Sequence, residues 1–328
     1  MRLQYNILWF ENDEDWIDSV VEDIQEFLLN NAFILNYDNQ KNASNLDTII
    51  AEIKDNTRDV DIILMDYQLL KHDKGDQLIK RIREKDVFTE ILFYSQKEAV
   101  REKFKDECIE GIYFSNRSDF THRLLQIVPH TIKKVLDLTN MRGLVMAETS
   151  LLDLQLNELL INMFLYLDKN DRCRRQEIVD KVFQKRLEHA DRIKDIEHTV
   201  IKKKKNFLLN VSNKDEYIKD ISYLLESIES SDRYQAVNKL AKIITGLLEW
   251  DKKLLNIFKG YDQEIIKMRN ILAHVKEEVI EGKIVLKSKF KGYESFTFSH
   301  QEFEEIRRSL IVHTKNIEDM NLEICKYI

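Results

Sequence analysis

The stretch VDIILMDY, residues 60–67, decides the fold of the first part of the chain. It is a continuous apolar run that ends in an acid, Asp66. Strands that are covered on both faces show such unbroken runs, whereas strands with one face in water alternate apolar and polar residues. We therefore expect a fully buried strand here, of the kind found inside a parallel sheet.

Similar runs lie on either side of this strand and alternate with helical patterns. Strands are expected at 5–10, 32–37, 90–95 and 111–115, and helices at 13–30, 45–55, 75–84, 96–107 and from about 119 onward. In the segment 13–30, for example, apolar residues recur at the spacing of one helix face. Five strands that alternate with helices predict an α/β fold with a parallel, doubly wound sheet.

Polar residues follow four of these expected strands. They are Glu11, Asn12 and Asp13 after the first strand, Asp66 at the third, Ser95 at the fourth, and Ser115, Asn116 and Arg117 at the fifth. The carboxyl ends of parallel strands meet at one edge of a sheet, where ligands usually bind. Clustered carboxylates there suit a hard cation such as Mg²⁺. A central carboxylate can also act as a nucleophile toward a phosphoryl group.

In this arrangement residues 3–135 resemble a response-regulator receiver domain. The resemblance implies that Asp66 is the phosphoacceptor. It also implies a Mg²⁺ site made by Glu11, Asp13, Asp66 and the backbone carbonyl of Gln68. The expected partner is a histidine kinase or another phosphodonor.

The same resemblance assigns the switch that reads the phosphoryl group to Ser95, Tyr113 and Arg117, and Gly75 to the turn into the next helix. Two features depart from the family pattern. The acidic pair reads Glu11-Asn12 in this chain, with an amide at its second position, and the usual lysine is replaced by Arg117 or Asn116. A degenerate receiver that no longer takes phosphate is therefore an alternative.

The rest of the chain is expected to be an all-α bundle. Helical periodicity covers 140–168, 174–192, 194–210, 214–228, 233–258 and 262–277. The segment 282–298 alternates and contains Gly292, which predicts a β-hairpin, and a last helix is expected at about 300–324. We expect two domains, 1–135 and 136–328, joined without a Gly- or Pro-rich linker.

The stretch RNILAH, residues 269–274, places polar residues inside an apolar helical pattern. Asn270 and His274 are four positions apart and share a helix face. Arg269 and His274 are five positions apart, about 140° around the helix at roughly 3.6 residues per turn. These residues are either a solvated helix edge or a catalytic pair.

Arg-Asn followed by His within a helical bundle resembles the HEPN family. The resemblance implies a homodimer in which paired Arg269 and His274 residues, supported by Asn270, form a metal-independent site for RNA cleavage. Such an endoribonuclease, controlled by the receiver, would act in stress response or antiviral defence. Glu148 or Asp153 could add an acidic group from the first helix of the bundle. The alternative is a non-catalytic response regulator whose helical part binds a protein or RNA partner.

The composition of the chain argues against several other classes of protein. The net charge is −7; residues 1–139 hold 18 Lys and Arg against 27 Asp and Glu, which leaves 33 against 31 in residues 140–328. A tail built to coat nucleic acid would be more basic. No apolar run approaches the roughly 18 residues of a membrane span. Cys108, Cys173 and Cys325 lie far apart, which favours the reducing cytoplasm.

Overall fold

The structure is a computed structural model of the chain, and it forms two compact units, 1–141 and 142–328. It describes residues 3–69, 74–96, 110–133, 137–171, 177–183, 214–226, 228–245, 258–281, 283–287 and 296–328. The division between the units falls in the first turn of helix α6 (Leu138–Asn170). The sequence-based boundary was placed a few residues earlier, at 135/136. In the described part, no helix is long and apolar enough to cross a membrane.

Within the described residues, the first unit is built on a parallel sheet of five strands. They are β1 (Gln4–Phe10), β2 (Ile34–Gln40), β3 (Ile62–Asp66), β4 (Ile91–Ser95) and β5 (Ile112–Asn116), in the spatial order β2-β1-β3-β4-β5. The order reverses direction between β1 and β3, so the carboxyl ends of these two strands flank a switch point. The α/β prediction with a parallel sheet is confirmed.

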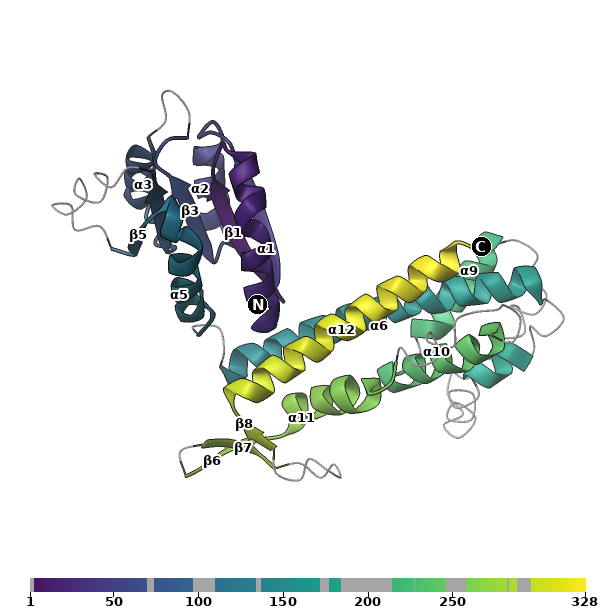
Figure 1. Cartoon of the computed structure of the whole chain (residues 1–328). Helices are drawn as coiled ribbons and strands as arrows, with labels where there is room; N and C mark the ends of the chain where they lie inside the picture. The colour runs from purple at the N-terminus through teal and green to yellow at the C-terminus, as the bar shows by residue number, and fades with distance from the viewer. Residues whose placement is uncertain are drawn as a thin grey trace. The chain divides into compact units, whose positions relative to one another are not determined.

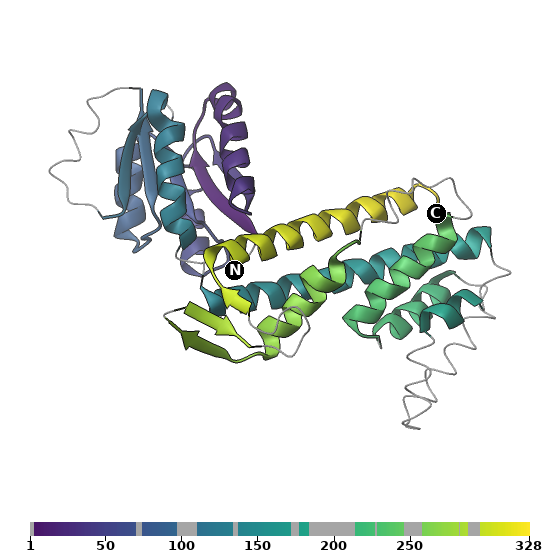
Figure 2. The ribbon, with the colours of Figure 1, turned by 60° about the horizontal axis from the view of Figure 1, so that its bottom comes forward.

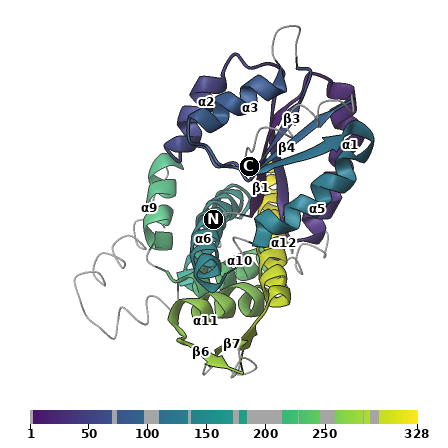
Figure 3. The same cartoon turned by 90° about the vertical axis from the view of Figure 1, so that its left-hand side faces the viewer.

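Helices cover both faces of this sheet, as Figures 1 and 3 show. They are α1 (Glu14–Asn30), α2 (Leu46–Lys54), α3 (Gly75–Glu84) and α5 (Phe120–Lys133), and a 3₁₀ turn, η1 (Arg117–Asp119), precedes α5. Alternate strand residues point to opposite faces. One set packs with α2 and α3, and the other packs with α1 and α5. The three inner strands β1, β3 and β4 are therefore buried on both sides, as the unbroken apolar runs predicted, whereas the edge strands β2 and β5 are only partly covered.

Strand β2 differs from its predicted position. The expected strand was 32–37, but the ladder with β1 runs from Ile34 to Gln40. Ala32 has a positive φ of 59° and belongs to the turn that follows α1. Ala32 and Phe33 are buried where this turn leads into β2. Their apolar side chains therefore place the expected start of the strand two residues too early. Of the predicted helix 96–107, the structure describes only residue 96, and the rest of that prediction lies outside the described residues.

The second unit is mostly helical. Its described helices are α6, α9 (Lys214–Glu226), α10 (Ser230–Thr245), the π-helix η4 (Asp262–Lys267), α11 (Met268–His274) and α12 (His300–Cys325), with a further helical stretch at 177–183. Helices α6 and α12 lie side by side (Figure 2). The hydrogen bonds Gln155–Glu318 and Asn162–Asn321 join them in a parallel arrangement.

The small sheet of this unit corrects two predictions. Strands β6 (Glu277–Ile280), β7 (Lys283–Leu286) and β8 (Phe296–Phe298) form an antiparallel sheet in that order. The hairpin was predicted at 282–298, but β6 and β7 already pair at 277–286. The helix predicted to reach 277 ends at His274, because Val275 has extended backbone (φ −92°, ψ 128°). All of β6 is exposed, so it lacks the buried alternation that marks a strand.

Candidate functional site

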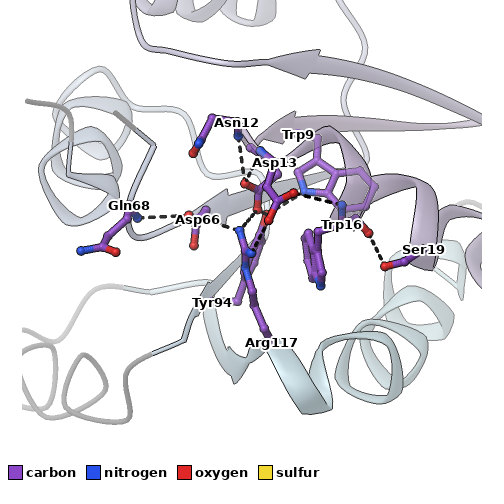
Figure 4. A network of polar contacts seen from close by, with 10 residues as sticks. Trp9, Asn12, Asp13, Trp16, Ser19, Asp66, Gln68, Tyr94 and Arg117 are labelled. Carbon is purple, nitrogen blue, oxygen red and sulfur yellow. Dashed lines mark hydrogen bonds and ion pairs between the residues drawn. The ribbon is translucent and has the colours of Figure 1, made fainter. Parts of the chain in front are cut away.

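The acidic site of the first unit lies where the sheet strands end (Figure 4). We define it by Glu11, Asp13, Asp66 and Arg117. Glu11 follows β1, Asp66 closes β3, and Arg117 begins the turn after β5. The topology brings the predicted carboxylates together at one edge, as expected of parallel strands. Glu11 is fully buried and Asp66 nearly so.

Glu11 uses both of its carboxylate oxygens. Its Oε1 accepts the backbone N–H groups of Asn12 and Asp13, each at 2.9 Å. Its Oε2 accepts the hydroxyl of Tyr94 at 3.0 Å and an N–H of Arg117 at 2.7 Å. A buried carboxylate is tolerated only when it is paired and hydrogen-bonded, and these four donors satisfy that condition.

Arg117 bridges the carboxylates from two strands. Its guanidinium donates to Asp13 Oδ2 at 2.8 Å and to Glu11, and it lies 3.7 Å from Asp66 Oδ2. The guanidinium carbon also lies 4.6 Å from the centre of the Trp16 ring, at the distance of a cation–π contact. The arginine is therefore held from two sides, by acids and by an aromatic face.

The charges shift the pKa values of these groups in opposite directions. Burial, together with the charge of Glu11, raises the pKa of Asp66 to about 6, although Arg117 and the backbone N–H groups of Gln68 and Tyr67 oppose the shift. The hydrogen bond from Arg117 lowers the pKa of Asp13. Burial lowers the pKa of Arg117, but its carboxylate neighbours outweigh burial and hold that pKa above its ordinary value. The surroundings therefore disfavour the ionised form of Asp66 and favour the ionised form of Asp13.

Gly75 lets α3 begin directly beside this site. A Cβ at Gly75 would lie 2.4 Å from the backbone oxygen of Asp66 and 2.7 Å from the ring of Phe93. Both contacts are far closer than real Cβ atoms allow. The glycine predicted for the turn is therefore required by the close approach of two backbones.

The predicted switch residues Ser95 and Tyr113 differ in burial and in the strand that carries them. Ser95 is buried at the end of β4. Tyr113 is half-buried on β5 and packs against the apolar cluster of α1 and α5. Gln68 donates its backbone N–H to Asp66 Oδ2 at 3.2 Å. The switch role of Ser95, Tyr113 and Arg117 stays a prediction.

The arrangement shown does not fit a Mg²⁺ ion held by the predicted ligands. Both oxygens of Glu11 and both oxygens of Asp13 accept hydrogen bonds, and Arg117 supplies one to each residue. Within the described part of the chain, no three His, Cys, Asp or Glu side chains are arranged to hold a metal ion.

The second unit carries the Arg-Asn-His motif on α11. Arg269 and Asn270 are half-buried, and His274 is exposed in the last turn. Arg142 of α6 donates to the carbonyl oxygen of Val275 at 2.8 Å, directly after the helix end. The last turn of α11 is therefore fixed to α6, and His274 lies at a defined place on the surface.

Arg269 belongs to a network of polar side chains from three helices, here called the arginine network: Asp153, Asn157, Ser230, Arg233 and Arg269. Arg269 donates to Ser230 Oγ at 3.4 Å, and Ser230 donates to Asp153 Oδ2 at 2.5 Å. Arg233 lies 3.5 Å from the same carboxylate oxygen and donates to Asn157 at 2.9 Å. Arg233 pairs with Asp153 directly, whereas Arg269 is linked to Asp153 only through the hydroxyl of Ser230. The five side chains thus carry two positive charges and one negative charge.

Tyr261 lies near this network. Its ring stacks on Tyr234 with a centroid distance of 5.0 Å. Burial raises the pKa of Tyr261, and the charge of Asp153 raises it further. The tyrosine comes immediately before η4, and η4 runs directly into α11. π-helical turns are rare and frequently lie at functional sites.

Sequence reasoning found part of both sites. It named Asp153 as a candidate acid and Arg117 as the replacement for lysine. It missed Ser230 and Arg233, because no spacing rule links a residue at the start of one helix to a motif on another. It also missed that Arg117 would contact two acids at once, since the reach of a side chain across strand ends is not visible in a pattern.

Comparisons with known proteins leave the family open. No family model matches the chain, and no curated protein matches it. Among solved structures, one similar chain is described as a yeast Spc42 trimeric coiled coil, amino acids 181–211, fused to another structure. It is 17% identical, covers 40% of this chain and 78% of that chain, and has a TM-score of 0.30, too low to support any conclusion about fold or function.

Proposed function

We propose that the second unit is a HEPN-like endoribonuclease that works without a metal ion, and that the first unit is a receiver-like regulatory domain. The observation that carries the proposal is the placement of Arg269. Its guanidinium donates to Ser230 Oγ at 3.4 Å, while His274 is exposed on the same helix. One short helix thus carries both a half-buried positive charge and an exposed imidazole.

These two groups supply the chemistry that RNA cleavage needs. A histidine titrates near neutral pH and can move the proton of the 2′-hydroxyl or of the leaving group. A guanidinium can stabilise the charge that develops on the phosphoryl oxygens. Asn270 precedes His274 by one helical turn and supports the local geometry in this proposal. The proposed active form is a homodimer in which two copies of α11 contribute to one site.

The first unit supports a regulatory role through its topology. The sheet order β2-β1-β3-β4-β5 is that of the flavodoxin-like group to which receivers belong, and Asp66 lies at the carboxyl end of the central strand. Phosphorylation of Asp66 by a histidine kinase or a small phosphodonor, read by Ser95 and Tyr113, is the signal that the resemblance implies. The ribonuclease proposal does not depend on that signal.

The decisive experiment is an RNA cleavage assay on the purified chain in EDTA, with total RNA and tRNA as substrates. We expect fragments from the wild type and a loss of about 10²-fold or more with His274→Ala, the range typical of a lost general acid or base. His300→Ala is the matched control, because His300 is an exposed histidine of the same unit that pairs only with Glu304 in the described contacts. Equal cleavage by His274→Ala and wild type would overturn the proposal.

A second function, a non-catalytic interaction module, is favoured by one observation. Leu151 and Leu154 of α6 are 54% and 65% exposed, and they flank Asp153 along the helix. Two exposed leucines three positions apart lie on one helix face and suit a protein partner. If neither the wild type nor the phosphodonor-treated protein cleaves RNA, partner binding through this face becomes the better reading.

A further inference from the structure

We propose that Arg117 is a built-in cation that takes the place of a divalent metal ion in the acidic site. The first unit would then hold its carboxylate cluster together without Mg²⁺. The inference concerns Glu11, Asp13 and Asp66 of the first unit and does not rest on the ribonuclease activity of the second.

The first observation is that the arginine already makes the contacts that a cation would make. Its two terminal nitrogens donate to Glu11 and Asp13 at 2.7 and 2.8 Å, and one of them lies 3.7 Å from Asp66. A guanidinium is planar and offers parallel N–H donors that match carboxylate oxygens. One side chain therefore contacts all three carboxylates of the site.

The second observation is that the carboxylate oxygens are committed to protein donors. Glu11 receives two backbone N–H groups and the hydroxyl of Tyr94 in addition to Arg117. Asp13 Oδ1 accepts the backbone N–H of Trp16 and so caps helix α1. A metal would have to displace several of these bonds at once, including bonds that define the start of a helix.

The third observation is that Arg117 is fixed in place from behind. Asn116 accepts the backbone N–H of Asp119 at 2.7 Å and the hydroxyl of Ser118 at 2.9 Å, which fixes the turn from which Arg117 projects. The ring of Trp16 lies against the guanidinium. Trp16 in turn packs on Tyr94 and Phe120, with ring centroids 5.1 and 4.9 Å apart. The arginine is preorganised and needs no ion to order it.

Trp16 also provides the readout, because its indole lies against the group that a metal would displace. The experiment titrates the full chain with MgCl₂ and separately with MnCl₂, and follows tryptophan fluorescence and the melting temperature. For the wild type we expect no saturable change with either metal. For Arg117→Ala we expect a saturable fluorescence change, and a melting temperature that rises by about 3 °C or more once the metal exceeds its Kd about tenfold.

Arg58→Ala is the matched control. Arg58 is another partly buried arginine of the same unit, and it pairs with Asp38 and Glu52 at a different place. Its removal should create no metal response. If Arg117→Ala does not fold, Arg117→Met keeps the apolar stem against Trp16 and removes the charge, and the same gain of metal binding is expected.

The proposal is overturned if the wild type shows a saturable Mg²⁺ or Mn²⁺ response that Glu11→Gln abolishes. It is equally overturned if folded Arg117→Ala and Arg117→Met bind neither metal, because the cluster would then not be a cation site at all. Neither result bears on RNA cleavage in EDTA, so this proposal and the ribonuclease proposal fail separately.

Discussion

The two candidate sites use arginine against carboxylate in opposite proportions. In the acidic site three carboxylates surround Arg117, and two of them, Glu11 and Asp66, are buried at the strand ends. In the arginine network Arg233 pairs with Asp153 and Arg269 is linked to it through Ser230, and His274 on the helix of Arg269 is exposed. In the first site the carboxylates of the same unit neutralise the positive charge of Arg117. In the second site the two arginines outnumber the single aspartate, which is the excess of positive charge that the proposed binding of RNA would use.

The largest expected effect is on the stability of the first unit. Arg117→Ala leaves Glu11 buried without its cation, and removal of one partner from a buried ion pair costs about 3–5 kcal/mol. We expect a loss of this size in urea unfolding monitored by tryptophan fluorescence. The control is Arg81→Ala, which breaks a single exposed pair with Asp47 and should cost at most about 1 kcal/mol. Equal losses would mean that Arg117 is an ordinary surface arginine.

The next effect tests the electrostatic cost of Asp66. Its folded-state pKa of about 6 lies above the ordinary value of 3.8, so the wild type loses stability as pH rises through about 4 to 6 and stays at the lower level above pH 6. Asp66→Asn removes this loss. We expect it to unfold like wild type at pH 4 but to be more stable by about 2–3 kcal/mol at pH 8.

The control is Asp47→Asn, at an exposed carboxylate of α2. The stability of this variant relative to wild type should not increase with pH. The measurement is urea unfolding of both variants at a series of pH values. If the advantage of Asp66→Asn does not grow with pH, ionised Asp66 is better stabilised by Arg117 than we infer, and the contrast between the two sites weakens.

A smaller effect tests how tightly the acidic site is packed. Gly75→Ala drives a Cβ into the backbone oxygen of Asp66, and such overpacking costs about 1–3 kcal/mol. Gly143→Ala on α6 is the matched control, because nothing lies within 4 Å of its Cβ position; it should stabilise by about 0.5–1 kcal/mol. Thermal unfolding of the two variants should therefore move in opposite directions. Shifts in the same direction would contradict the close approach at Gly75.

The smallest effect tests the second site. Ser230→Ala removes the hydroxyl between Arg269 and Asp153. Loss of one hydrogen bond of this kind costs about 1–1.5 kcal/mol, so we expect RNA cleavage to fall by about tenfold while the fold is kept. The control is Ser222→Ala, because the hydroxyl of Ser222 donates to the carbonyl of Ile218 one turn earlier in α9; this variant should leave cleavage unchanged. A loss as large as that of His274→Ala would make Ser230 part of the chemistry itself.

The sequence predicted the first unit better than the second for a physical reason. Buried parallel strands such as Ile62–Asp66 are unbroken apolar runs, and their ends fix where Glu11 and Asp66 meet. The segment Glu277–Ile280 has no buried side to mark it as a strand, and Val275 and Val279 continue the spacing of the preceding helix. The residues that complete each site, Arg117 and Ser230, act through side-chain reach between elements, which no local pattern records.

The position of α6 across the division between the two units determines where recombination could replace one unit without interrupting a helix. The division between the units falls between Met141 and Arg142, one turn into a helix that continues to Asn170. A recombination crossover there would take the first turn of α6 from one parent and the rest of the helix from the other, and would separate Met141 from Arg142. A crossover before Leu138 would transfer the whole helix, together with Arg142 and its bond to the end of α11. A different first unit is therefore best accepted at the start of α6, with the second unit inherited intact.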